Sequence, residues 1–307
     1  MKEGRPIIIG TRGSDLAMAQ ANIVANLLKR KNKGLKLKIM KIKTEGDSST
    51  NNSKLALTGK DLFTRAIDKA LVEKMVDIAV HSLKDLPVEN SESSKLEIGA
   101  YPKRENPSDV LISKRSAGTL ENLPHNARVG TSSVRRAVQL KHVRPDIEIV
   151  ELHGNVETRI NKLRTSKLDA IVLAKSGLKR LGRSNMGKII PHNQMLPAIG
   201  QGCLAVTIRK NDKFTKWLVS KIDDGDTRCA VSAERAFSKE LGGGCNTPIA
   251  ALATIRMGKI VLDGLVEKNE TSQSSIIVRG RVSGQKEDAE NLGKALAIQL
   301  KKMNSGE

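Results

Sequence analysis

The stretch Pro6-Ile7-Ile8-Ile9-Gly10-Thr11-Arg12-Gly13-Ser14 decides the fold class of this chain of 307 residues. Its apolar run between a proline and a glycine predicts a short buried strand over residues 6–10. Ser14 is a favoured N-cap residue, and Leu16, Ile23 and Leu27 follow it at helical spacing. A strand that leads through a tight turn into a helix is the first half of a βαβ unit.

The same alternation continues through the first hundred residues. A lysine-rich strand over residues 35–39 comes next, and a polar loop over residues 47–53 follows it. A helix over about residues 61–73 then leads to a strand over residues 77–81. This βαβ rhythm predicts a mostly parallel sheet with helices on both faces.

Two further units follow along the chain. The second begins near residue 104 and contains strands at 109–112, 147–152 and 169–173, with helices after Ser133 and Asn155. The rhythm breaks near residue 195, where residues 196–202 read as a connecting strand. A helix at 226–240, strands at 249–255, 260–266 and 274–282 and a helix at 286–302 predict a small α+β domain at the C-terminal end.

Composition and charge limit the class of protein. The chain is 38% hydrophobic and 28% charged, which is typical of a globular protein of two or three domains. Its N-terminal segment has an apolar run of only three residues, so we expect no export signal, no membrane span and a cytoplasmic location. The cysteines, Cys203, Cys229 and Cys245, lack metal-ligand spacing, so we expect no metal site and no disulfide framework.

The formal net charge of +20 has two competing explanations, nucleic-acid binding and a cleft for an acidic small molecule. The densest basic stretch, residues 29–43, contains eight Lys or Arg and no acidic residue. No aromatic residue interleaves with these lysines, which disfavours a platform for stacking bases. We therefore expect a solvated lysine face here and no nucleic-acid partner.

Four segments place small or hydroxyl residues beside Arg or Lys where a strand ends and a helix begins. They are residues 11–14, 82–84, 130–133 followed by Arg135 and Arg136, and 154–155 followed by Arg159. Free backbone N–H groups at helix starts favour anions, and arginine binds carboxylates in a bidentate manner. One such segment alone is more often an ordinary capped helix. Four at equivalent positions predict a cleft for a carboxylate-rich ligand.

Two side chains suggest chemistry beyond binding. Asp85 follows a strand end in His81-Ser82-Leu83-Lys84-Asp85-Leu86-Pro87, where a carboxylate can stabilise a cation or move a proton without a metal. Cys245 follows three glycines, which suit an accessible thiol, although a lone cysteine is more often a buried apolar residue. Cys203 and Cys229 lie in apolar or helical contexts and are expected to be structural. No Walker A loop or GxGxxG motif is present, so we expect neither nucleotide hydrolysis nor hydride transfer.

Nine ordered strings carry a resemblance to a known family. They are Gly10–Ser14, Thr44–Asp47, Asp77–Pro87, Gly130–Arg136, Gly154–Arg159, Gly177–Arg180, Pro197–Gly202, Ala233–Ala236 and Gly243–Pro248. Over nearly its whole length, the chain resembles the hydroxymethylbilane synthases, also called porphobilinogen deaminases. The resemblance implies an α/β fold with two doubly wound domains like periplasmic binding proteins, at 1–103 with 203–222 and at 104–202. A small α+β domain at 223–307 would carry the cofactor loop.

The resemblance also implies an activity in tetrapyrrole biosynthesis. Members of the family condense four porphobilinogen molecules head to tail with loss of ammonia, on a dipyrromethane primer bound through a thioether, and release hydroxymethylbilane. Cys245 matches the attachment position, and Asp85, beside Lys84, matches the aspartate that stabilises the azafulvene cation. The positions that match binding residues for acetate and propionate groups are Arg12, Ser14, Lys60, Ser82, Thr131, Ser132, Arg135, Arg136, His153, Asn155, Arg159, Arg180, Gln201 and Gly202. A monomer without a membrane partner is expected from the same resemblance.

Some positions depart from the family pattern. His153 stands where Arg is usual, and Gly242 replaces a common Glu. Thr58 and Asp61 replace glycines, and Ala66 replaces a Glu. We expect normal chemistry with altered elongation kinetics. The alternative from another class is a non-catalytic anion-binding protein, which would leave the glycine-rich cysteine loop and the third domain without a role.

Overall fold

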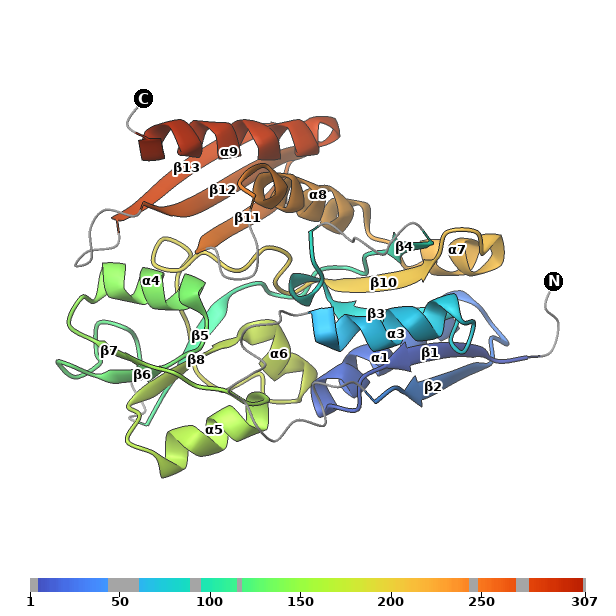
Figure 1. Cartoon of the computed structure of the whole chain (residues 1–307), viewed down its shortest axis with the longest axis horizontal. Helices are drawn as coiled ribbons and strands as arrows, with labels where there is room; N and C mark the ends of the chain where they lie inside the picture. Colours follow the sequence, from blue (N-terminus) through green and yellow to red (C-terminus); the bar gives the residue numbers. More distant parts are fainter. Residues whose placement is uncertain are drawn as a thin grey trace. The chain divides into compact units, whose positions relative to one another are not determined.

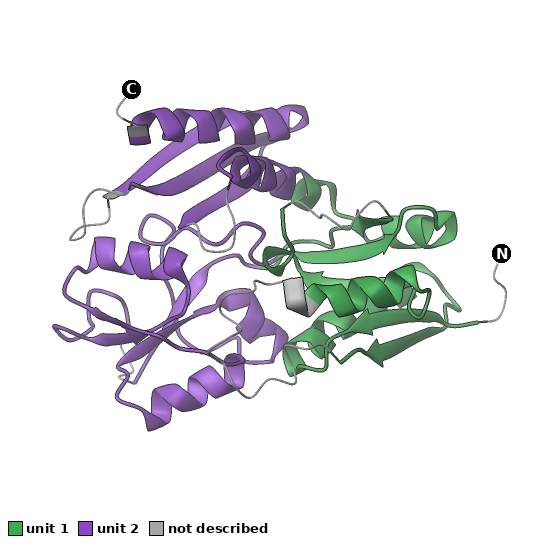
Figure 2. Ribbon diagram, viewed as in Figure 1, with its two compact units in different colours: residues 1–105, 203–228 green, residues 106–202, 229–307 purple. Residues whose placement is uncertain are grey.

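The computed structural model describes residues 5–43, 61–88, 95–114, 118–242, 248–268 and 276–305. The chain divides into two compact units, Met1–Glu105 with Cys203–Arg228 and Asn106–Gly202 with Cys229–Glu307 (Figure 2). The expected third domain is thus grouped with the second in one compact unit, and the three-domain boundaries stay a prediction.

The first unit contains one five-stranded sheet in the order β2-β1-β3-β10-β4 (Figure 1). Its elements are β1 (Ile7–Thr11), α1 (Asp15–Lys31), β2 (Leu37–Lys41), α3 (Asp61–Val72), β3 (Ile78–Ser82), β4 (Leu96–Ala100), β10 (Leu204–Arg209) and α7 (Lys213–Ser220). β1 is parallel to β2 and β3, whereas β10 is antiparallel to β3 and β4. The expectation of a mostly parallel sheet is therefore wrong. The chain returns to this sheet through β10 in the opposite direction, so only half of the pairings are parallel.

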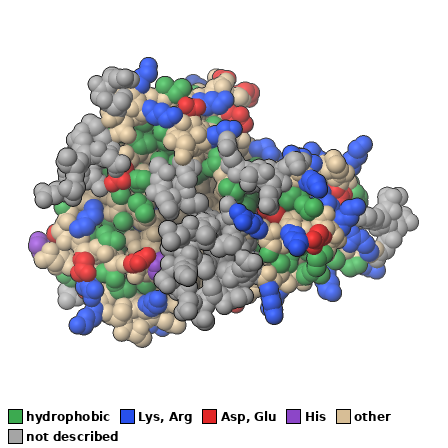
Figure 3. Space-filling model, in the orientation of Figure 1, with side chains coloured by type: hydrophobic (Ala, Val, Ile, Leu, Met, Phe, Trp, Pro, Cys, Tyr) green, Lys and Arg blue, Asp and Glu red, His purple; other side chains and the backbone are tan. Residues whose placement is uncertain are grey.

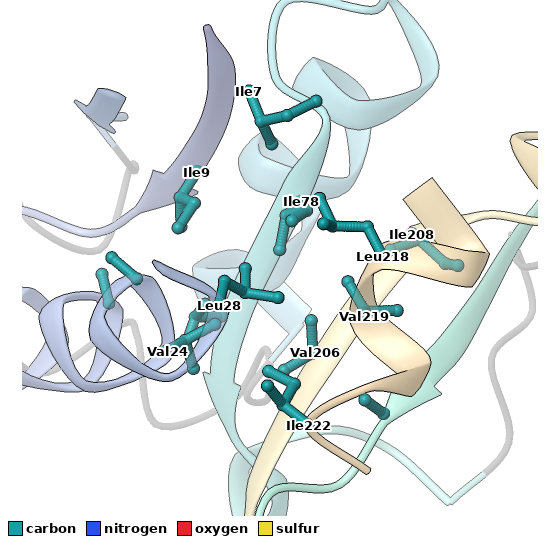
Figure 4. Packing of buried hydrophobic residues seen from close by; sticks show 14 of the residues in the cluster. Ile7, Ile9, Val24, Leu28, Ile78, Val206, Ile208, Leu218, Val219 and Ile222 are labelled. Carbon is teal, nitrogen blue, oxygen red and sulfur yellow. The ribbon is translucent and has the colours of Figure 1, made fainter. Parts of the chain in front are cut away.

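The core of the first unit explains why its elements form. Ser14 caps α1, because its Oγ accepts a hydrogen bond from the backbone N of Ala17 at 3.4 Å. Val24 and Leu28 of α1 are fully buried against Ile9 and Ile78 of the sheet (Figure 4). The expected positions Ile23 and Leu27 are half-buried at the margin of this cluster, so the buried stripe of α1 lies one residue further along.

The second unit contains a sheet of the same design, in the order β7-β6-β8-β5-β9. Its elements are β5 (Asp109–Ser113), β6 (Arg128–Gly130), α4 (Val134–Val143), β7 (Glu148–Val150), α5 (Val156–Thr165), β8 (Ala170–Ala174), α6 (Lys175–Arg180) and β9 (Lys188–Ile189). β6 is parallel to β7 and β8, and β5 is antiparallel to β8 and β9.

The segment 196–202 of the second unit is not a strand. Instead it turns, and the N–H of Gln201 donates to the carbonyl of Ala198 at 2.8 Å. Gly200 and Gly202 have φ angles of 68° and 91°. These left-handed conformations suit glycine and interrupt an extended strand, so the expectation of a connecting strand is wrong.

The C-terminal part of the second unit is an antiparallel sheet, β11-β12-β13, with two helices. Its elements are α8 (Gly225–Glu240), β11 (Ile249–Arg256), β12 (Lys259–Lys268), β13 (Ile276–Gln285) and α9 (Ala289–Ser305). The first residues of α8, up to Arg228, belong to the first unit. Phe237 of α8 and Leu296 and Leu300 of α9 are fully buried in the core of this part. The two doubly wound sheets and this α+β part confirm the expected fold class.

Candidate active site

The first unit gathers five of the expected site residues at one edge of its sheet. β1 and β3 are parallel neighbours, with Gly10 opposite Ala79, so both strands end at the same edge. Arg12 and Ser14 follow β1 directly, and the string Ser82-Leu83-Lys84-Asp85 ends β3. The carboxyl edge of parallel strands is where open α/β sheets bind ligands.

Asp85 is exposed at the end of a 3-10 turn, Leu83–Asp85. Two buried leucines fix this turn: the N–H of Leu83 donates to the carbonyl of Cys203 at 3.1 Å, and the N–H of Leu86 donates to that of Leu83 at 3.0 Å. Lys84, between Leu83 and Asp85, is half-buried. These bonds therefore fix the backbone at Asp85, while its side chain faces water.

His81 is buried one turn before Asp85. Burial lowers the pKa of His81 to about 4, because the charged imidazolium would lose its hydration. The charge of Asp85 opposes this shift and that of Arg12 adds to it, so both charges act on the ring. Nε2 of His81 has no hydrogen-bond partner among the residues that the structure describes. The ring is thus neutral at pH 7 and provides no positive charge to balance the negative charge of Asp85.

Gln20 contacts the candidate site and was not predicted from the sequence. It lies on the buried face of α1, and its Nε2 donates to Oγ of Ser82 at 2.7 Å. This bond ties the helix after β1 to the end of β3. A polar residue on an otherwise apolar helix face is the signal that could have identified it.

In the second unit, the hydroxyl residues Thr131 and Ser132 hold the loops after β6 and β7 in place. Ser132 Oγ donates to the carbonyl of Leu152 at 2.6 Å and accepts from the N–H of Leu152 at 3.1 Å. Thr131 is buried, and its Oγ1 accepts from the N–H of Ser133 at 3.1 Å. The bonds of Ser132 therefore connect the loop after β6 to the loop after β7, and that of Thr131 stabilises the first of these loops.

The loop after β7 presents its polar side chains to water. His153 is exposed, and its Nε2 lies 2.7 Å from Oε1 of Glu151, an ion pair only when the ring is protonated. Asn155 caps α5 by accepting from the N–H of Thr158 at 2.9 Å. The half-buried Arg159 donates from Nε to the carbonyl of Gly154 at 2.7 Å.

Arg135 and Arg136 are buried around an acid that the sequence analysis did not single out. Both pair with Asp109, which is 0% exposed: Arg135 NH2 lies 2.9 Å from Oδ2 and Arg136 NH2 lies 2.7 Å from Oδ1. Burial would raise the pKa of Asp109, but the two guanidinium charges outweigh it and hold that pKa well below its usual value. Two cations therefore surround one carboxylate, which leaves a net positive charge at this place.

Arg180, Gln201 and Gly202 lie together near the same acid. Arg180 NH2 donates to the carbonyl of Gly202 at 2.6 Å, and Gln201 Nε2 donates to Oδ1 of Asp109 at 3.0 Å. The structure thus makes two groups in this unit: the buried one around Asp109, and the exposed one after β7.

Lys60, Thr58 and Cys245 lie outside the described residues. Two further departures from the family pattern lie in α3: Asp61 is its first residue, and Ala66 is half-buried. Gly242 lies in the turn that follows α8 and has a φ of 64°, a conformation that disfavours the Glu common at this position in the family. Cys203 is buried and Cys229 is half-buried, in agreement with structural roles.

Within the described ranges, no three His, Cys, Asp or Glu side chains gather closely enough to hold a metal ion. The described helices also include none with the length and apolar character needed to cross a bilayer.

Comparisons with known proteins identify relatives of this chain. Residues 7–217 match the family model described as porphobilinogen deaminase, dipyromethane cofactor binding domain, and residues 228–302 match the C-terminal domain of porphobilinogen deaminase. A porphobilinogen deaminase from Pelotomaculum thermopropionicum is 43% identical over 304 residues, which is 99% of this chain and 96% of the relative. One from Moorella thermoacetica is 43% identical over 302 residues, 98% of this chain and 95% of the relative.

Among solved structures, substrate binding domain 2 of Lactococcus lactis GlnP is similar over 79% of this chain and 93% of its own, with 12% identity and a TM-score of 0.44. An extracellular-binding protein of a probable amino-acid transporter from Bacillus subtilis covers 72% of this chain and 90% of its own, with 14% identity and a TM-score of 0.41. The family models and the full-length relatives carry the assignment: this chain belongs to the porphobilinogen deaminase family.

Proposed function

We propose that this protein is a hydroxymethylbilane synthase, a transferase of tetrapyrrole biosynthesis. It condenses four porphobilinogen molecules head to tail, releases ammonia at each step and yields hydroxymethylbilane. The observation that carries the proposal is the exposed Asp85 side chain, on a turn with buried anchors at the carboxyl edge of β3. The chain that presents it matches the family almost from end to end.

In this proposal, Asp85 is the catalytic residue. Loss of ammonia leaves a positive charge on the substrate pyrrole, and a fixed carboxylate stabilises that charge without reorganisation. The neutral His81 contributes no positive charge that would weaken Asp85. Lys84, adjacent to Asp85, is proposed to hold a substrate carboxylate.

The described residues fit a carboxylate-rich dipyrromethane cofactor and its growing chain. Each pyrrole ring brings two carboxylates, so negative charge accumulates during elongation and needs fixed cations. Arg12 in the first unit and the two groups in the second unit offer such cations and neutral donors beside them. We propose that Cys245 anchors the cofactor through a thioether, which keeps the chain attached between cycles. The cofactor supplies the free pyrrole carbon to which substrate is added.

The experiment that tests the function is intact-protein mass spectrometry of the wild type and of Cys245→Ala. The wild type is expected to carry the added mass of a dipyrromethane, and Cys245→Ala is expected to lack it and to be inactive. Cys229→Ala is the matched control, because it removes a half-buried thiol elsewhere and should keep the added mass. A wild type of unmodified mass, even after exposure to porphobilinogen, would favour the non-catalytic anion-binding alternative.

A further inference from the structure

The motif Ala233–Ala236 has no role in the proposed chemistry, yet it contains a fully buried carboxylate. Glu234 of α8 is 0% exposed. Its Oε2 accepts a hydrogen bond from the N–H of Gly200 at 2.7 Å, and its Oε1 accepts one from the N–H of Ala253 at 2.9 Å. A carboxylate is costly to bury, and two short bonds to N–H donors compensate for lost hydration.

The two donors belong to segments that are far apart in the sequence. Ala253 lies in β11, an edge strand of its sheet. Gly200 lies in the turn 196–202, which contains the family string Pro197–Gly202. Glu234 therefore joins the C-terminal sheet to this turn within the second unit.

The segment 196–202 also contacts the buried group of Arg135, Arg136 and Asp109. Gln201, next to Gly200, donates from Nε2 to the carbonyl of Pro107 at 2.7 Å and to Asp109 at 3.0 Å. The carbonyl of Leu196 accepts from Arg135 NH1 at 2.6 Å. A displacement of the turn would therefore move both Asp109 and Arg135.

We propose that Glu234 is a positioning residue. It fixes the turn 196–202 against β11, and through Gln201 and Asp109 it sets the arginine pair of α4 relative to the strand that follows the cofactor loop. β11 begins at Ile249, four positions after Cys245 in the sequence. The inference rests on the proposed function, because it assigns the arginine pair to carboxylate groups of the substrate and cofactor.

The first variant is Glu234→Gln, which keeps the shape of the side chain. An amide has only one acceptor oxygen, so its NH2 group would face one of the two N–H donors. We expect the covalent cofactor mass to remain and KM for porphobilinogen to rise by roughly tenfold, with kcat within about threefold of wild type. Such a split is the mark of lost binding that is equal in the ground and transition states.

Leu300→Ala is the control for stability. Leu300 is fully buried in the same core but lies on α9, and its truncation leaves a cavity without a change in hydrogen bonding. At an equal loss in free energy of unfolding, Leu300→Ala is expected to keep the wild-type KM. An equal KM rise in both variants would make Glu234 a stabilising residue only and would overturn the proposal.

A double-mutant cycle with Gln201→Leu tests the route. If Glu234 acts through Gln201, the double variant should have a KM no higher than that of the worse single variant. KM increases that multiply would overturn the route. Glu234→Asp keeps the charge with a shorter reach, and it carries the same test if Glu234→Gln does not fold. If the wild-type protein has neither cofactor nor turnover, the proposed function is wrong. If the wild-type protein is active and Glu234→Gln has the same KM, only the proposed role of Glu234 is wrong.

Discussion

At the end of β3, two buried residues, His81 and Leu83, precede the exposed Asp85. The buried residues decide where the backbone lies, and the exposed one is available to a ligand. The same division holds around Asp109, where Arg135 and Arg136 are almost inaccessible and are oriented by an internal acid. Their contact with substrate carboxylates stays a prediction.

Replacement of Asp85 by Asn removes the charge and keeps the size of the side chain. We expect kcat to fall by about 10²–10³, since stabilisation of a developing charge by one fixed group is of that order. The covalent cofactor mass of purified protein and the fold, followed by circular dichroism, should be unchanged. Glu73→Gln, which neutralises an exposed carboxylate directly after α3, is the control and should keep wild-type turnover. Substantial turnover in Asp85→Asn would remove Asp85 from the catalytic role.

His81 predicts a pH dependence of stability. Its pKa is about 4 in the folded protein and about 6.5 in the unfolded chain, so the unfolded chain binds more protons between these pH values. The contribution of neutral His81 to the free energy of unfolding is therefore complete above pH 6.5. It is lost as the pH falls towards 4, by up to about 3 kcal/mol. Denaturant titrations at several pH values give the free energy of unfolding at each pH. This free energy should depend less steeply on pH between 4 and 6.5 in His81→Gln than in the wild type. His125→Gln, at an exposed histidine, is the control, and an unchanged slope in His81→Gln would contradict the assignment. The lowered pKa of Asp109 acts in a separate window, because its contribution is lost only as the pH falls below the usual 3.8.

Among the elements, the packing of α9 on α8 depends on a glycine. A Cβ at Gly293 would clash with the carbonyl oxygen of Ala233 and would lie 2.9 Å from both Cβ of Ala236 and the backbone N of Phe237. The two helices therefore approach at this residue more closely than a side chain permits.

Gly293→Ala tests this close packing. In an isolated helix, the change would stabilise by about 1 kcal/mol through propensity. Here the clash involves backbone atoms that cannot move independently, so we expect a net loss of about 1–3 kcal/mol in free energy of unfolding. Lys294→Ala changes the exposed neighbour on the same helix and should have little effect. A denaturant midpoint that rises in Gly293→Ala would show that the helices separate at little cost.

On the scale of the whole molecule, the net charge of +20 is a property of the entire chain. On the face drawn in Figure 3, Lys and Arg side chains are spread widely, with Asp and Glu between them. Like charges on a compact protein repel one another, and that repulsion opposes folding. The same charge attracts an anionic substrate, so salt should act on stability and on binding in opposite ways.

We expect Tm to rise and substrate affinity to fall when sodium chloride increases from about 0.01 M to about 1 M, since the Debye length decreases from about 30 Å to about 3 Å. Thermal unfolding measures the first effect, and KM for porphobilinogen at each salt concentration measures the second. A Tm that falls with salt would mean that attractive ion pairs, such as Arg209 with Asp77 and Asp212, outweigh the repulsion.

The sequence by itself determined most of the secondary structure, the fold class and the family. Ser14 caps its helix as expected, and β1, β2, β3, β5, β7 and β8 lie within a few residues of the expected strands. The other strands of the two large sheets, β4, β6, β9 and β10, were not expected from the sequence. These features depend on neighbours in the sequence, through periodicity, capping and turn residues. The neighbouring sequence also predicted that Asp85 follows the end of a strand.

Only the tertiary structure decided which strands pair and which polar groups share a buried site. β10 pairs with β3 although more than a hundred residues separate them, and this return makes half of the first sheet antiparallel. Asp109 lies 27 positions from Arg136, and Glu234 lies 34 positions from Gly200. No periodicity records such partners, because burial of a charge is decided by the elements that pack around it. The physical reason is that the energy of a buried carboxylate depends on distant donors, whereas helix and strand formation depends largely on adjacent residues.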